Sequence, residues 1–178
     1  LILVVVAGAE LFTGNNLLAM AWADGKISTL DVLRNWAIVC GGNFIGATGL
    51  ALFVFLSHHP EMNNGAVAQE YLRIAEAKVT MPFWTAFFKG ILCNVLVCMA
   101  VWMALAGRSV IDKVVAIVFP ISAFVAAGFE HSVANMYLIP FAMLLQSVEN
   151  TGGGAGAITW AGLFGNLAPV ILGNIIGG

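Results

Sequence analysis

The sequence predicts an all-α integral membrane protein, built as an inverted repeat of three plus three spans with two broken helices. Hydrophobic residues make up 61% of the chain and charged residues only 9%, whereas soluble domains average about 25% charged residues. Several apolar segments are long enough to cross a bilayer as a helix. In addition, a pair of short motifs occurs twice along the chain in the same order.

Five candidate spans alternate with more polar connections. Because about 20 apolar residues cross the hydrocarbon core as a helix, we expect spans at residues 1–22, 36–56, 83–106, 114–146 and 156–177. The first and fourth are interrupted, at residues 10–16 and 128–135. Both interruptions combine Gly, Asn and hydroxyl side chains, which favour non-helical backbone. Such backbone is tolerated at membrane depth only where it is buried in protein or lines a cavity.

The two interruptions belong to an internal repeat. The pattern G-x-E-x-x-x-x-N occurs at residues 8–15 and 128–135, and G-N-x-I-G follows at residues 42–46 and 173–177. Each copy therefore has a broken span first and a Gly-Asn span second. Two short matches in the same order are much less easily explained by chance than either match alone.

The repeat also predicts how the chain is divided. Span 83–106 precedes the second pair of motifs, so we expect a matching first span to be missing before Leu1. An odd number of spans per copy makes the copies face opposite ways across the membrane, with the broken helices meeting near its middle. We therefore expect a single transmembrane channel domain over residues 1–178. It comprises a partial first repeat at 1–56, an outer loop at 57–82 and a second repeat at 83–178.

The basic residues predict the orientation of the connections. Lys and Arg occur in the connections at 23–35 and 107–113, but not in the connection at 146–157. By the positive-inside rule the two basic connections are cytoplasmic. The connection at 57–82 is then outside, and its apolar spacing suggests a short amphipathic helix lying on the surface. Its His58 and His59, followed by Glu61, are interpreted as a solvated loop rather than a metal site.

Several other classes of protein find little support. There is no basic cluster that would bind nucleic acid, and Cys40, Cys93 and Cys98 lie in apolar runs without metal-ligand spacing, as packing residues do. No cofactor is expected. A membrane enzyme would need more than Glu130 beside His131, a purely structural membrane protein would not explain two broken helices, and a neutral-solute channel of the aquaporin type lacks its Asn-Pro-Ala pair.

The ionisable residues within the interruptions are the candidate functional groups, because charges at bilayer depth are rare and by default functional. Glu10 and Glu130 occupy equivalent positions, so we expect these helix-break carboxylates to accept hydrogen bonds from free backbone N–H groups and so hold each loop. A direct role as ion ligand or proton carrier is the alternative. His131 has no counterpart, since Leu11 takes its place in the first copy. This asymmetry and its titration near physiological pH favour a functional role for His131.

The charge pattern suggests what crosses the membrane. The Lys and Arg residues lie in connections, apart from Lys89 near a span end, so we expect no fixed cation near the middle of the membrane. Broken helices offer free N–H groups and positive dipole ends that suit an anion. An apolar path on either side of one histidine suits a small weak acid, which would gain a proton at His131 and cross in neutral form.

These motifs resemble the two signatures of the formate–nitrite transporter family. The resemblance rests on residues 10–15 and 128–135, on 108–113 and on the tail 173–178, and it covers nearly the whole chain. It implies an aquaporin-like, six-span protomer that assembles as a homopentamer in the bacterial inner membrane, each protomer with its own pore for formate. Gly14-Asn15-Asn16 also occurs in nitrite and hydrosulfide relatives, which keeps those two anions as alternatives.

The resemblance further assigns roles to individual residues. Thr13 would face His131 across the pore centre, where Asn94 and Asn174 would hold the imidazole by hydrogen bonds. Lys78 would draw anions into the outer vestibule. The apolar constrictions would be formed by Leu1 and Phe124 on one side, and by Leu11, Phe12 and Val97 on the other.

Overall fold

A computed structural model describes residues 1–148 and 158–178, and within these residues the regular structure is helical throughout. Most of the expected connection at 146–157 lies outside the described residues. The helices are α1 Ile2–Ala7, η1 Asn15–Leu17, α2 Leu18–Ala23, α3 Thr29–Leu56, η2 His59–Glu61, α4 Ala66–Val79, α5 Phe83–Ala106, α6 Val110–Ala126, α7 Ser132–Val148 and α8 Trp160–Gly177. The predicted all-α class is therefore confirmed, and helices surround both interruptions.

Local capping explains where two of the helices begin. Ser28 precedes α3, and its hydroxyl accepts from the Asp31 N–H while the Asp31 carboxylate accepts from the Ser28 N–H. Ser109 and Asp112 form the same reciprocal pair before α6. Each pair satisfies backbone donors that a helix start leaves free. As a result α3 and α6 begin earlier than the spans expected at 36 and 114.

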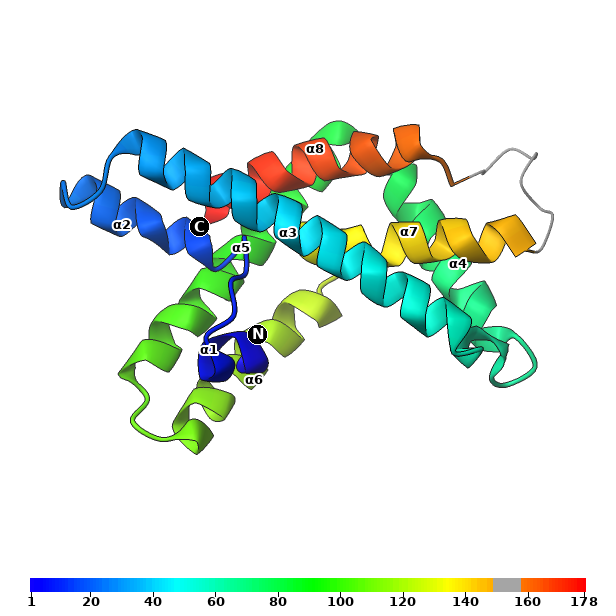
Figure 1. Cartoon of the computed structure of the whole chain (residues 1–178), viewed down its shortest axis with the longest axis horizontal. Helices are drawn as coiled ribbons and strands as arrows, with labels where there is room; N and C mark the ends of the chain where they lie inside the picture. Colours follow the sequence, from blue (N-terminus) through cyan, green and yellow to red (C-terminus); the bar gives the residue numbers. More distant parts are fainter. Residues whose placement is uncertain (149–157) are drawn as a thin grey trace.

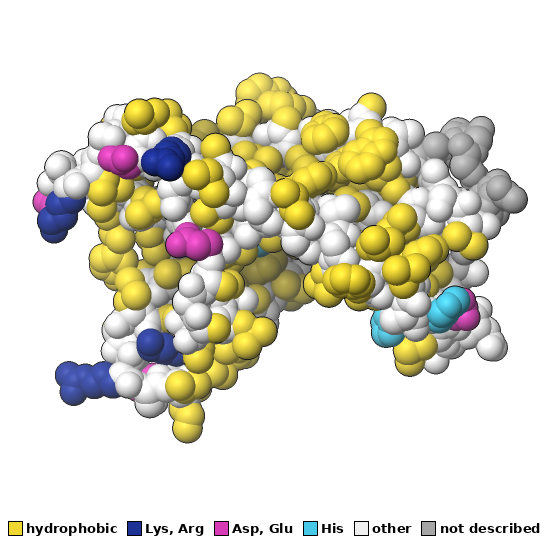
Figure 2. Space-filling view, viewed as in Figure 1, with side chains coloured by type: hydrophobic (Ala, Val, Ile, Leu, Met, Phe, Trp, Pro, Cys, Tyr) yellow, Lys and Arg dark blue, Asp and Glu magenta, His cyan; other side chains and the backbone are white. Residues whose placement is uncertain are grey.

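The outer surfaces of the helices fit a lipid environment. α3, α5 and α8 are long and apolar enough to cross a membrane, and α7 is a shorter apolar helix. Ile45, Phe53 and Phe119 are each at least 70% exposed, which would be costly in water. In Figure 2, hydrophobic side chains cover much of the middle of the face shown, and most of the visible Lys and Arg side chains lie at the opposite end from the histidines.

Pairwise packing of the helices brings the two interruptions together. α8 packs along α5, α7 along α3, and α6 along α5. In Figure 1 α3 crosses the molecule diagonally in front of α7, and the breaks between α1 and α2 and between α6 and α7 both lie near the middle of the view. Within these breaks Thr13 and Glu130 are buried, whereas residues 8–10 of the first break are exposed.

The helix α4 differs from its expected place. The amphipathic helix forms, but it does not merely lie on a surface, because it packs against α7 and α8. Its small residues Ala68 and Ala75 are buried, and Ala75 joins a core cluster with Ile139 and Leu163. Small side chains on one face let this helix approach its neighbours closely. The preceding loop is exposed, and there His58 Nδ1 lies 2.5 Å from Glu61 Oε1.

The close contact between α5 and α8 depends on glycine. A Cβ atom at Gly173 would lie 2.2 Å from the carbonyl oxygen of Phe87, and one at Gly90 would lie 2.9 Å from that of Val170. By contrast, Gly42 and Gly46, which match Gly173 and Gly177 in the repeat, have no described atom within 4 Å of such a Cβ. The matched glycines therefore have different surroundings in the two copies.

We expect the substitution Gly173→Ala to destabilise the protein by about 3 kcal/mol, because its methyl group can only be accommodated by moving backbone. Thermal unfolding of the detergent-solubilised full-length protein measures this effect. Gly165→Ala on the same helix is the matched control, since no described atom lies within 4 Å of its added Cβ. Equal stability of the two variants would contradict the close crossing.

Candidate functional site at the two helix breaks

The break between α6 and α7 places His131 at the start of a helix. α6 ends at Ala126, and Gly128 then adopts a left-handed backbone conformation with φ +64°, which glycine tolerates without a steric cost. α7 begins at Ser132, so the side chain of His131 lies at the positive end of the α7 dipole. The first break has the same design, because α1 ends before Gly8 at φ +74°.

The first break brings Thr13 to His131. Thr13 Oγ1 lies 3.0 Å from His131 Nε2, although the two residues are far apart in sequence. Thr13 is fully buried, and its carbonyl oxygen accepts from the Cys98 thiol. The side chains that the family resemblance placed opposite each other are therefore in direct contact.

A second contact of His131 identifies which ring nitrogen carries the proton. The backbone N–H of Ala134 donates to His131 Nδ1 at 3.1 Å, so Nδ1 acts as an acceptor. A neutral imidazole has one N–H and one acceptor nitrogen, so its proton is on Nε2 and is donated to the Thr13 oxygen. The hydroxyl proton of Thr13 is thus available for another acceptor. The ring of Phe124 stacks on the imidazole, with centroids 5.7 Å apart.

An apolar cavity of about 300 Å³ adjoins this contact. Four of the five expected constriction residues line it together with His131, namely Leu1, Leu11, Val97 and Phe124. Phe12 does not line it: its side chain is buried in the protein, and its backbone N–H donates to Asn43. The structure thus brings residues of both expected constrictions to one cavity beside the imidazole.

The two asparagines expected to hold the imidazole contact the backbone instead. Asn174 Nδ2 donates to the carbonyl oxygens of Gly90 and Glu130, and its Oδ1 accepts from the Ser132 N–H. Asn94 Nδ2 donates to the carbonyl oxygen of Asn174. For Asn174 the physical reason is that the break leaves the Glu130 carbonyl and the Ser132 N–H without helical partners, and burying such groups unpaired is costly. Asn174 thereby holds the residues on either side of His131.

The position of Lys78 also departs from expectation. Its Nζ lies 2.8 Å from Glu130 Oε1, and the side chains are only 14% and 3% exposed. A fixed cation therefore does lie beside the break, and within this contact Lys78 is a partner of Glu130 rather than a free charge in an outer vestibule. The packing of α4 on α7 brings it there, and the carbonyl oxygen of Lys78 accepts from Asn166 on α8.

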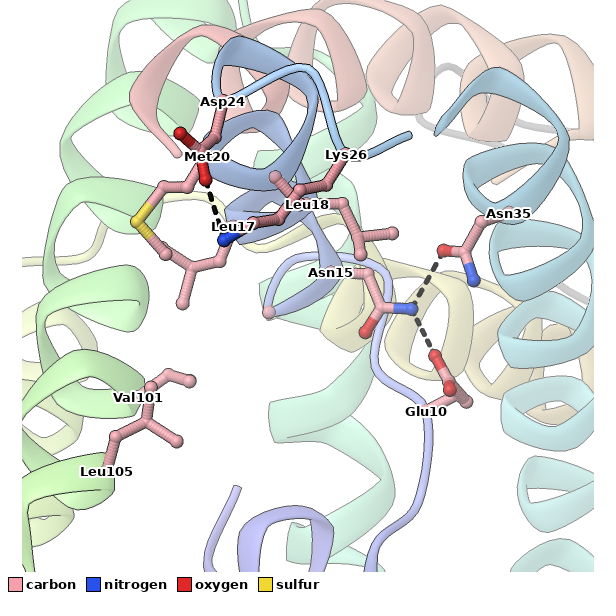
Figure 3. A pocket seen from close by; sticks show the side chains of 12 residues that line it. Glu10, Asn15, Leu17, Leu18, Met20, Asp24, Lys26, Asn35, Val101 and Leu105 are labelled. Atoms are coloured by element: carbon pink, nitrogen blue, oxygen red, sulfur yellow. Dashed lines mark hydrogen bonds and ion pairs between the residues drawn. The ribbon is translucent and has the colours of Figure 1, made fainter. Parts of the chain in front are cut away.

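Glu10, the counterpart of Glu130, lies in different surroundings. It is exposed and borders a cavity of about 550 Å³, together with Asn15, Asn35 and Val101. Figure 3 shows Asn15 between the Glu10 carboxylate and Asn35, with hydrogen bonds to both. The larger cavity is therefore beside the first carboxylate and not beside His131.

Equivalent residues hold the two breaks by equivalent hydrogen bonds. Asn43 Nδ2 donates to the Glu10 carbonyl oxygen at 3.1 Å, and Asn43 Oδ1 accepts from the Phe12 N–H at 2.9 Å. For Asn174 the same bonds to Glu130 and Ser132 measure 3.1 and 3.0 Å. The repeat in the sequence matches Asn43 with Asn174, but it does not by itself indicate a role for Asn43. The order of the motifs contained the signal that could have indicated one, because a Gly-Asn motif follows the break in each copy.

Comparisons with known proteins agree with this architecture. The chain is 39% identical to the protein named "Formate channel FocA" of Haemophilus influenzae, over 99% of this chain and 66% of that protein. It is 40% identical to "Formate channel FocA" of Escherichia coli K12, over 100% of this chain and 66% of that protein. It thus spans slightly less than two thirds of these relatives.

A solved structure has the same fold. The structure described as "Pentameric formate channel with formate bound" superimposes with a TM-score of 0.86 at 35% identity, over 99% of this chain and 73% of that one. The sequence model of the family described as "Formate/nitrite transporter" matches residues 1–178. The family indicated by the two motifs is therefore confirmed, and this chain belongs to the formate/nitrite transporter family.

Proposed function

We propose that the chain forms the pore of a channel for formate and related small weak-acid anions. The observation that carries this proposal is the contact between Thr13 and His131, which joins the two helix breaks beside an apolar cavity. The names of two relatives and the bound formate in a similar structure support formate as the substrate. Nitrite and hydrosulfide are the alternatives within the family, but these two relatives and this similar structure are all named for formate.

The groups at the break suit a small carboxylate. The Thr13 hydroxyl can donate to one carboxylate oxygen, and His131 Nε2–H can turn from Thr13 to donate as well. The positive end of the α7 dipole adds to the attraction for an anion. Leu11, Val97 and Phe124 exclude water from the same space, which strengthens these polar interactions.

His131 would let formate cross the apolar path without its charge. Transfer requires the cationic imidazole, so the Ala134 N–H must first release Nδ1, and a proton from water must then bind that atom. The Nε2–H bond breaks as an O–H bond forms on formate, which leaves a neutral imidazole and formic acid. A neutral molecule pays far less than an anion for leaving water. Formic acid returns the proton on the far side of the constriction.

The same proposal covers the assembly and its location. A homopentamer with one pore per protomer in the bacterial inner membrane is supported by the pentameric structural relative and by the extensive exposed apolar surface. The activity is transport and not an enzymatic reaction. We also propose that 1–56 and 83–178 are the two repeats, separated by the outer loop 57–82, since the equivalent hydrogen bonds occur on both sides of it.

Flux measurements on the purified full-length protein in proteoliposomes test the proposal. Formate, nitrite, hydrosulfide and glycerol are compared under equal gradients. We expect rapid formate flux and no glycerol flux above that of protein-free vesicles. Nitrite or hydrosulfide flux faster than formate flux would favour the corresponding alternative, and glycerol flux would contradict an anion pathway.

The substitution Thr13→Val tests the pore-centre contact. Valine keeps the shape of threonine but removes the hydroxyl, so His131 Nε2–H loses its acceptor and formate loses a donor. Because one hydrogen bond contributes about 1 kcal/mol, we expect formate flux to fall about fivefold. Thr13→Ser, which retains the hydroxyl, should keep most of the flux. Equal flux through the valine and serine variants would remove Thr13 from the transport path.

A further inference from the structure

The carboxamides of Asn15 and Asn135 are each held by a further asparagine that the proposed mechanism does not use. Asn15 Nδ2 donates to Asn35 Oδ1 at 2.9 Å, as Figure 3 shows. Asn135 Nδ2 donates to Asn166 Oδ1 at 2.7 Å. The two acceptors are equivalent, because each lies eight residues before the asparagine of its Gly-Asn motif.

These bonds fix the direction of the carboxamide that faces each glutamate. Asn135 Nδ2 also donates to Glu130 Oε2 at 2.6 Å, and Asn15 Nδ2 donates to Glu10 Oε2. A carboxamide nitrogen has two N–H donors, so in both copies one points to the glutamate and the other to the asparagine of the Gly-Asn helix. The amide therefore cannot rotate without losing a partner.

In the second copy this arrangement is buried and reaches His131. Asn135 is fully buried and Asn166 is only 2% exposed. Asn166 Nδ2 donates to the Lys78 carbonyl oxygen at 2.9 Å, which connects α8 to α4. Hydrogen bonds thus link Asn166 to Asn135 and Asn135 to Glu130, and Glu130 directly precedes His131 in the chain.

We propose that Asn166 and Asn35 are positioning residues for the pore centre, Asn166 for the break that carries His131 and Asn35 for the break that carries Thr13. Each accepts the second proton of the break's carboxamide and so keeps that carboxamide on its glutamate. The two asparagines thereby fix the positions of the two breaks whose side chains, Thr13 and His131, contact each other. This inference rests on the proposed function in so far as the effect is measured as formate flux.

The substitution Asn166→Ala removes the acceptor and leaves a buried N–H of Asn135 unpaired. We expect formate flux to fall about tenfold or more, because displacements near 1 Å at a reacting centre can cost about a hundredfold. The pH profile of flux should change as well, since the imidazole is no longer held against Thr13. Because Asn166 acts through Asn135, the double variant Asn135→Ala/Asn166→Ala should lose less flux than the two single losses combined.

Two measurements on the full-length protein separate this inference from the proposed function. The first is formate flux in proteoliposomes. The second is the set of ¹⁵N NMR signals of the His131 imidazole in detergent, a measurement that requires no transport. Gly165→Ala, adjacent to Asn166 and unobstructed, is the control. Asn35→Ala is the second variant, at a partly exposed position, should Asn166→Ala fail to assemble.

Changed imidazole signals in the asparagine variants, with the control unchanged, support the positioning role even if the wild type conducts no formate. Absence of formate flux in the wild type would instead overturn the proposed function. Wild-type signals and wild-type pH profiles in both asparagine variants would overturn the positioning role. If the losses of formate flux in the two single variants simply added in the double variant, the positioning role would also be overturned, because Asn166 would then not act through Asn135.

Discussion

The substitution His131→Asn should abolish the pH dependence of formate flux and lower the flux by about a hundredfold, the contribution typical of a positioned acid–base group. Asparagine can still hydrogen-bond to Thr13, but it cannot gain or lose a proton between about pH 5 and 8. Initial rates of formate uptake into proteoliposomes across this range measure both effects.

Thr13→Ser is a suitable companion variant, because it preserves the polar contact at the pore centre and leaves the imidazole in place. Its pH profile should match that of the wild type. If the His131→Asn protein kept both the wild-type rate and the wild-type pH profile, proton exchange at the imidazole would play no part in transport.

The substitution Lys78→Met should destabilise the protein by about 3–5 kcal/mol, because it leaves the buried Glu130 carboxylate without its cation. The carboxylate is only 3% exposed, so water cannot take over the role of the ammonium group. Thermal unfolding in detergent gives the loss of stability, and formate flux reports whether the break that carries His131 is displaced.

A rescue experiment distinguishes this role from attraction of anions. Adding Glu130→Gln to Lys78→Met removes the uncompensated charge and should restore much of the stability. Glu10→Gln is the matched control, since Glu10 is exposed and lacks a described cation partner. If Lys78→Met changed only the salt dependence of flux and left stability intact, Lys78 would act as a vestibule charge after all.

Much of the fold could be predicted because a membrane imposes strong constraints on sequence. The length of the apolar run at 83–106 predicted α5 with its observed bounds, and clusters of Gly and Asn predicted both breaks. The His131 position followed from comparing the two copies, and its contact with Thr13 followed from the family resemblance. The starts of α3 and α6 lie earlier than predicted. Their capping residues Ser28 and Ser109 lie in polar connections, where hydropathy does not mark the start of a helix.

The remaining features depend on packing that no short motif records. Apolar spacing predicts that Lys78 lies on a surface helix, and the family resemblance gives it a vestibule role. The contact with Glu130 depends instead on the packing of α4 against α7 and α8, where Ala68 and Ala75 are buried. Phe12 was assigned to a constriction, but the hydrogen bond from its backbone to Asn43 turns its side chain into the core. Asn35 and Asn166 could have been found by extending the repeat, because their spacing from Asn43 and Asn174 is the same.

The most direct measurement of the central claim is the simultaneous recording of formate and proton movement in proteoliposomes that contain the full-length protein. If formate crosses the apolar cavity after taking a proton at His131, each formate should be accompanied by a proton, and an imposed membrane potential should not change the rate. Formate flux that carries charge, responds to the membrane potential and moves no protons would contradict the account.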